Sequence, residues 1–77
     1  MRDKILEMLK EIAPDSDFEG SRDFFTDELV DSFGTITMVT MLEEMFAIRI
    51  EADDITADNF MNLEAIEALM NKYVGQE

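Results

Sequence analysis

The chain of 77 residues contains no cysteine and no histidine, and 19 acidic against 6 basic side chains give it a net charge of −13. The absence of these two residue types excludes a disulfide framework, a Cys/His zinc site, cysteine nucleophiles and histidine-based catalytic pairs. Hydrophobic residues make up 47% of the chain, enough for one packed domain over residues 1–77, and no stretch reaches the roughly 18 apolar residues of a membrane span. We therefore expect a single soluble domain in the cytoplasm.

The first predicted helix covers residues 3–13, because Ile5, Leu9 and Ile12 recur at helical spacing and Pro14 stops it. A connector over residues 15–31 follows, which is long for so small a domain. We expect this connector to be pinned to the core by its apolar side chains, Phe18, Phe24, Phe25 and Leu29.

The second predicted helix begins at Asp31 or Ser32 and ends at Phe46 or Ala47. On a helical wheel it has one broad apolar side and an opposite polar side. The apolar side consists of Met38, Val39, Leu42, Met45 and Phe46, and the polar side of Thr37, Thr40, Glu43 and Glu44.

Phe33 and Ile36 fall on the polar side of this helix, close to Ser32. One explanation is that the connector folds back and covers them. The other is an exposed apolar patch ringed by glutamates, which is typical of interaction surfaces. The wheel does not choose between the two.

Two further helices complete the prediction. Residues 48–50 alternate like a strand, but three residues without a partner strand make no sheet. A short helix is expected around residues 56–61 and a last one over residues 63–74, capped by Asn62. The last helix has an apolar face consisting of Leu63, Ile66, Leu69 or Met70, and Tyr73. The sum is a small all-α bundle of three long helices and one short helix.

The negative charge is concentrated in residues 23–71, where twelve acidic side chains stand against one base, Arg49. Such a field repels nucleic acid and anionic lipid and attracts basic protein surfaces. Acidity confers no more than solubility on many proteins. For so small a chain we expect basic protein partners, no nucleic acid, no membrane insertion and a monomer.

The connector contains a run that partly matches a calcium-binding EF-hand loop. Asp15, Asp17, Glu19 and Asp23 occupy loop positions 1, 3, 5 and 9, with a glycine at position 6. The bidentate glutamate of position 12 is missing, since Thr26 stands there, and no second loop exists to pair with this one. An acidic, solvated turn without a metal is therefore favoured, with a calcium-responsive module as the alternative.

Ser32 stands where the polar connector gives way to the second helix. A serine or aspartate there is an ordinary helix cap, although the capping-box glutamate is missing three residues on. The free N–H groups and positive dipole end of a helix N-terminus also suit an attached phosphate. Gly34 lowers the helix propensity by roughly 1 kcal/mol relative to alanine, and it could let another group approach the backbone closely. The residues alone leave both roles of Ser32 open.

The sequence around Ser32 resembles that of acyl and peptidyl carrier proteins. The run Asp31-Ser32-Phe33 is similar to their Asp-Ser-Leu signature, and the similarity extends in order over nearly the whole chain. It also includes Glu28-Leu29-Val30, Ile36-Thr37-Met38-Val39, Leu42-Glu43-Glu44-Met45-Phe46, Ile48-Arg49-Ile50 and Asn59-Phe60.

This resemblance implies a bundle of the acyl-carrier type with 4′-phosphopantetheine attached through the Ser32 hydroxyl. It implies no catalytic residue in the chain, which would be the substrate of a phosphopantetheinyl transferase that uses coenzyme A. The terminal thiol of the arm would hold acyl or aminoacyl groups as thioesters. The partners would be activating ligases and downstream transferases or synthases. They would place basic patches of their own surface against the second helix. The implied partner-binding residues are Asp31, Phe33, Ile36, Glu43 and Glu44.

The resemblance leaves the cargo open. The run from Asp31 to Thr35 is similar to D-alanyl carrier proteins, whereas fatty-acid carriers more often have leucine after the serine. Glu28 stands where a glycine is common, and Thr37 stands where many relatives carry glutamate. We expect a stand-alone carrier of the fatty-acid, polyketide or D-alanyl type. An acidic adaptor that docks through the second helix and is never modified is a further alternative.

Overall fold

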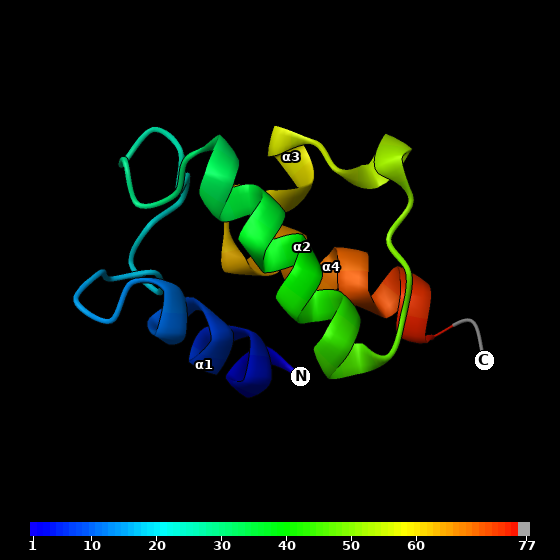
Figure 1. Cartoon of the computed structure of the whole chain (residues 1–77). Coiled ribbons are helices and arrows are strands. Elements are labelled where there is room, and N and C mark those ends of the chain that lie inside the picture. Colours follow the sequence, from blue (N-terminus) through cyan, green and yellow to red (C-terminus); the bar gives the residue numbers. More distant parts are fainter. Residues whose placement is uncertain (76–77) are drawn as a thin grey trace.

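The computed structural model describes residues 1–75. It has three long helices, α1 (Arg2–Ile12), α2 (Ser32–Phe46) and α4 (Leu63–Val74), and two short elements, the 3₁₀ turn η1 (Ala52–Asp54) and the helix α3 (Ala57–Phe60). α1 packs against both α2 and α4, and α3 packs against α4 (Figure 1). The predicted all-α fold with three long helices and one short helix is confirmed, while the sequence pattern gives no indication of η1.

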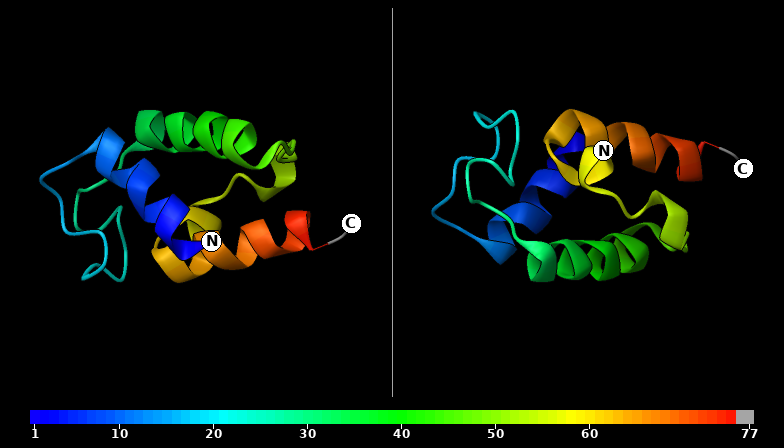
Figure 2. Two further views of the ribbon diagram at one scale, coloured as in Figure 1. Left: turned by 90° about the horizontal axis from the view of Figure 1, so that it is seen from below. Right: turned by 90° about the horizontal axis from the view of Figure 1, so that it is seen from above.

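The arrangement of the helices places the start of α2 at one end of the molecule. In Figure 2, α2 lies along one side and α4 along the other, and α1 runs obliquely from beside α4 toward the start of α2. The connector between α1 and α2 closes the same end. Among residues 1–75 no helix is both long enough and apolar enough to cross a membrane.

The connector is fixed by its aromatic side chains, as predicted. Phe18 and Phe24 are fully buried and meet edge to face, with ring centroids 5.1 Å apart and an interplanar angle of 86°. Such a pair adds about 0.5–1.5 kcal/mol beyond its burial. The Phe24 N–H also donates to the Met61 carbonyl at 2.6 Å, and the Asn62 side chain donates to the Arg22 carbonyl at 2.9 Å. The connector is therefore held against the junction of α3 and α4.

Two helices, α1 and α3, differ from the prediction by one residue at each end. α1 begins at Arg2 and ends at Ile12, because Ala13 is extended (φ −146°), as the residue before a proline tends to be. The short helix α3 covers Ala57–Phe60 and not residues 56–61, because Thr56 is its cap and accepts a hydrogen bond from the Asn59 N–H. The bounds of α4 and its Asn62 cap are as predicted.

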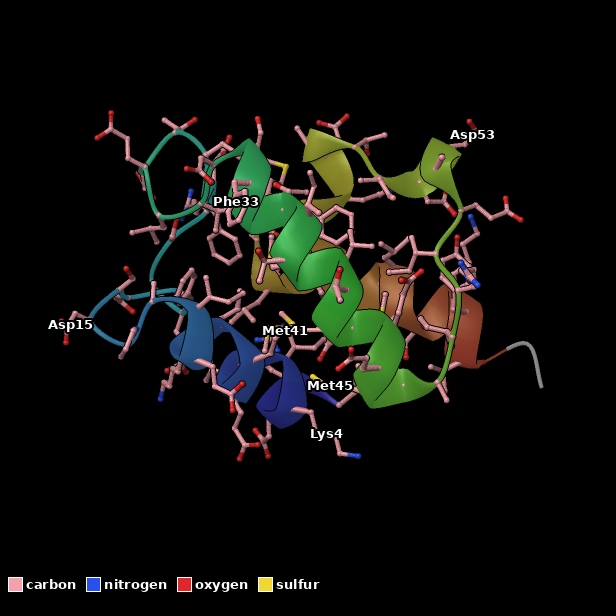
Figure 3. The ribbon with its side chains drawn as sticks, viewed as in Figure 1. Lys4, Asp15, Phe33, Met41, Met45 and Asp53 are labelled. Atoms are coloured by element: carbon pink, nitrogen blue, oxygen red, sulfur yellow. The ribbon has the colours of Figure 1, made fainter. Side chains whose placement is uncertain are left out.

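The two sides of α2 agree with the helical wheel except at two positions. Met38, Val39 and Leu42 are buried, as expected. Met45, predicted on the apolar side, is 37% exposed, because it lies with Met41 and Lys4 in a shallow groove between α1 and α2 (Figure 3). Glu43, predicted on the polar side, is half-buried, because its carboxylate accepts a hydrogen bond from the Ile50 N–H at 2.9 Å.

α2 is followed by its C-cap Ala47, which adopts a left-handed conformation with φ 53° and ψ 48°. Its N–H donates to the Glu43 carbonyl and closes the last turn. A Cβ makes this conformation unfavourable, and glycine usually occupies such a position. Ala47 is thus a local departure from the preferred residue type.

A polar cluster fastens η1 to the C-terminal end of α4. The Asp54 carboxylate accepts hydrogen bonds from the Lys72 ammonium, at 2.8 Å, and from the Tyr73 hydroxyl, which in turn accepts one from the Glu51 N–H at 3.0 Å. The bond from Lys72, followed by that from Tyr73, lowers the pKa of Asp54. The hydrogen bond between Lys72 and Asp54 also raises the pKa of Lys72. The pKa of Tyr73 is raised mainly by burial and secondly by its hydrogen bond to Asp54.

We expect Ala47→Gly to raise the free energy of unfolding by about 0.5–1 kcal/mol, since glycine adopts the left-handed conformation without a steric penalty. Ala68→Gly is the matched control, because Ala68 lies in the middle of α4 and is exposed. There the same change should lower the free energy of unfolding by about 1 kcal/mol. Thermal melts followed by circular dichroism measure both. Effects of the same sign would contradict the difference in backbone conformation.

The lowered pKa of Asp54 predicts an acid-dependent contribution to stability. The contribution is present above the unfolded pKa, near 4, and is lost as the pH falls through the lower pKa of the folded state. Asp54→Asn should therefore lower the free energy of unfolding at pH 7 and reduce the further loss between pH 7 and about pH 3. Asp53→Asn, at the exposed neighbouring position, is the control for the charge change. Denaturant titrations at the two pH values that show the same loss for both variants would contradict the role of this cluster.

Candidate functional site

The start of α2 is fixed by the side chain of Asp31. Asp31 is extended (φ −117°, ψ −172°), and its carboxylate accepts a hydrogen bond from the Gly34 N–H at 2.8 Å. Its carbonyl accepts bonds from the N–H and the hydroxyl of Thr35, at 2.9 and 3.0 Å. Asp31 is therefore the N-cap, and Ser32 is the first residue inside the helix.

Because Asp31 takes the cap, the Ser32 hydroxyl is left unused. The side chain is exposed and makes no hydrogen bond within residues 1–75. The N–H groups of Ser32 and Phe33 stand in the first turn, where an α-helix provides no acceptor. This end of α2 also carries the positive end of the helix dipole. The site thus combines a free hydroxyl with two donors that suit phosphate oxygens.

The other two serines lack this setting. Ser16 and Ser21 both lie in the connector and are half-buried. The Ser21 hydroxyl donates a hydrogen bond to the Asp27 carboxylate. Of the three serines in the chain, only Ser32 begins a long helix.

Gly34 is explained by packing within the chain. A Cβ at this position would lie 3.1 Å from the Val30 side chain and 3.4 Å from the Asp31 carboxylate. Val30 is buried, so it has little room to move. The close approach expected from the sequence is therefore made by Val30 and the capping carboxylate.

The predicted partner-binding residues fall into two groups along α2. Phe33 and Ile36 are 78% and 63% exposed, so the connector does not cover them, and they lie within one turn of Ser32. Glu43 and Glu44 lie about 17 Å from Ser32 along the helix axis. Glu44 is exposed, whereas Glu43 is engaged with Ile50. The structure therefore brings the apolar pair, but not the acidic pair, next to the serine.

An open cleft of about 990 Å³ lies beside Ser32, and sequence reasoning missed it. Its walls come from the C-terminal end of α1, the connector and the first three turns of α2. No periodic pattern signals it, because the end of α1 (residues 11–13) and the stretch over residues 25–41 are separated in the sequence. Its lining includes Ile12, Leu29, Val30, Ser32, Phe33 and Met41.

The carboxylates of the partial EF-hand match do not form a metal site. Within residues 1–75, no group of three or more acidic side chains is arranged to hold a metal ion. The Asp17 carboxylate accepts a bond from the Gly20 N–H, and the Asp23 carboxylate accepts bonds from the N–H groups of Thr26 and Phe25. The backbone bond from Thr26 is the main cause of the lowered pKa of Asp23. These carboxylates therefore serve local turns.

A family model described as "Phosphopantetheine attachment site" matches residues 2–70. No curated protein and no solved structure matches the chain. The matched segment contains all of α1, α2 and α3, most of α4, and the whole site at the start of α2.

The role of Asp31 as the cap of α2 is testable by substitution. We expect Asp31→Ala to lower the free energy of unfolding by about 1 kcal/mol, whereas Asp31→Asn, which still offers a side-chain oxygen, should stay close to the wild type. Denaturant unfolding measures both variants. Equal losses would indicate that the negative charge, and not the hydrogen bond, stabilises the start of the helix.

Proposed function

Because the chain belongs to the phosphopantetheine attachment-site family, we propose that it is a stand-alone carrier that is modified at Ser32. The family carries 4′-phosphopantetheine covalently on a serine, and its carrier domains are not themselves catalytic. Attached there, the arm supplies a terminal thiol that holds acyl or aminoacyl groups as thioesters. The observation that carries the proposal is the free Ser32 hydroxyl at the start of a capped, 15-residue helix.

The residues around Ser32 fit this group. In the attachment step, the Ser32 hydroxyl oxygen would form a bond to the coenzyme A phosphorus that bears the pantetheine arm, and its proton would pass to a base of the transferase or to water. The bond from that phosphorus to the bridging oxygen would break, with adenosine 3′,5′-bisphosphate as the leaving group. The free N–H groups of Ser32 and Phe33 are then placed to donate to the phosphodiester oxygens. Asp31 holds the helix start without using the hydroxyl.

We further propose that partners dock on the exposed side of α2. Phe33 and Ile36 supply apolar contact next to the modified serine. Asp31, Glu44 and the half-buried Glu43 supply negative charge, so transferases, ligases and synthases with basic patches are the expected partners. Because Glu43 is also bonded to Ile50, Glu44 is the stronger candidate for a contact.

The attachment site is tested by intact mass. After incubation with coenzyme A and a broad-specificity phosphopantetheinyl transferase, we expect the wild type and Ser21→Ala to gain one phosphopantetheine group and Ser32→Ala to gain none. Circular dichroism confirms that Ser32→Ala is folded, which is expected because Asp31 provides the cap. No gain by the wild type would contradict the proposal and favour an unmodified acidic adaptor.

The docking surface is tested by the rate of the same modification. We expect Phe33→Ala to lower kcat/KM for the transferase about tenfold, the effect of losing one central apolar contact in an interface. Ile55→Ala is the matched control, because Ile55 is also an exposed apolar residue but lies beyond η1. It should leave the rate unchanged.

Salt separates the charged part of docking from the apolar part. Added salt should lower kcat/KM for the wild type, since exposed charges are screened over about 8 Å at physiological ionic strength. The ratio of wild type to Phe33→Ala should stay constant, because the apolar contact is not screened. A rate indifferent to salt would contradict steering by the acidic helix.

A further inference from the structure

The cleft beside Ser32 is close enough to receive what the serine carries. Ser32 itself lines the cleft, so a group attached to its hydroxyl begins at the rim. The volume of about 990 Å³ lies at the upper end of the range of small-molecule sites. The inner wall is apolar and is supplied by all three segments, with Ile12 from α1, Leu29 from the connector and Met41 from α2.

The charged side chains that line the cleft are all carboxylates. Glu11, Glu28 and Asp31 line it, and no lysine or arginine does. Asp31 is bonded to the Gly34 N–H as the helix cap. Glu11, in the last turn of α1, and Glu28, in the connector, are exposed and form no ion pair within residues 1–75. The rim therefore favours a cation and disfavours an anion.

Glu28 holds this place in an unfavourable backbone conformation. Its φ is 60°, in the left-handed region where a Cβ is disfavoured by roughly 1 kcal/mol and glycine is not. Residues held in sparsely populated conformations gather at functional sites. The chain thus keeps a carboxylate on the rim of the cleft at a position that glycine fits better.

We propose that this cleft is a resting site for the arm on Ser32 when the arm carries a small aminoacyl thioester with a free ammonium group. The proposal rests on the modification of Ser32 proposed above. The phosphodiester stays at the first N–H groups of α2, and the arm crosses the apolar wall. The ammonium group then pairs with Glu11 or Glu28. A neutral acyl group forms no such pair, and a carboxylate-bearing acyl group is repelled by the two side chains.

The expected preference is modest, because the rim is exposed. An exposed ion pair changes an equilibrium about two- to fivefold. The resting state should therefore be populated two to five times more with an ammonium-bearing cargo than with a neutral cargo of the same size. Added salt should reduce this ratio, since the carboxylates are screened.

The test uses the full chain loaded by the transferase with three coenzyme A analogues, in which an NH group replaces the thioester sulfur. The analogues carry glycyl, propionyl and malonyl groups, and the first two differ only in ammonium against methyl. Two-dimensional ¹H–¹⁵N spectra report which backbone amides each arm perturbs. We expect the glycyl arm to perturb Ile12, Leu29 and Met41 two to five times more than the propionyl arm. The malonyl arm should perturb only the first turn of α2.

Paired charge variants identify the cause. Glu11→Gln with Glu28→Gln should abolish the difference between the glycyl and propionyl arms. Glu19→Gln with Glu64→Gln makes the same change in net charge at two exposed positions that do not line the cleft, and it should leave the difference intact. Thermal melts of each variant confirm that it is folded.

The outcomes separate this inference from the proposed function. Three arms that attach but perturb the same amides, or that perturb amides of α3 and none of the cleft, would overturn the resting site and leave the carrier proposal standing. A difference that survives the Glu11 and Glu28 changes would also overturn it. Arms that fail to attach to Ser32 would overturn both.

Discussion

The hydrogen bond between the Gly34 amide and the Asp31 carboxylate determines how the start of α2 is built. Because Asp31 provides the cap, Ser32 enters the helix with an unused hydroxyl, and the first amides of the helix stay open to phosphate oxygens. The same register directs Phe33 and Ile36 outward beside the serine. The absence of a Cβ at Gly34 lets Val30 pack closely below this turn. The attachment site and the apolar patch thus depend on one capping interaction.

The acidic side chains fall into two groups with different roles, which the net charge alone does not reveal. Some carboxylates accept hydrogen bonds from the backbone or from side chains and stabilise local structure; Asp17, Asp23, Asp31, Glu43 and Asp54 belong to this group. Others, such as Glu11, Glu28 and Glu44, are exposed. We assign direct contact with partners and cargo mainly to this second group, while Asp31 and Glu43 add their negative charge at the surface of α2.

The helices and the burial of the connector follow from the sequence, because the spacing of apolar residues and the capping residues are local signals. The exposure of Phe33 and Ile36 does not follow, since it depends on the path of the connector, which periodicity does not encode. The helical wheel predicts that Glu43 faces solvent, but the turn after α2 brings the Ile50 N–H to its carboxylate. The wheel does not encode the path of that turn. The cleft does not follow from the sequence either, because it joins the end of α1 to residues 25–41, and local patterns do not predict the positive φ of Glu28.

The most direct test of this account is to locate the modified residue by peptide mapping. Trypsin, which cuts after lysine and arginine, separates residues 11–22, which contain Ser16 and Ser21, from residues 23–49, in which Ser32 is the single serine. After treatment with coenzyme A and the transferase, we expect the phosphopantetheine mass on residues 23–49, with fragment ions that assign it to Ser32. An added mass on residues 11–22, or on a threonine of residues 23–49, would contradict the claim that the capped start of α2 selects the attachment site.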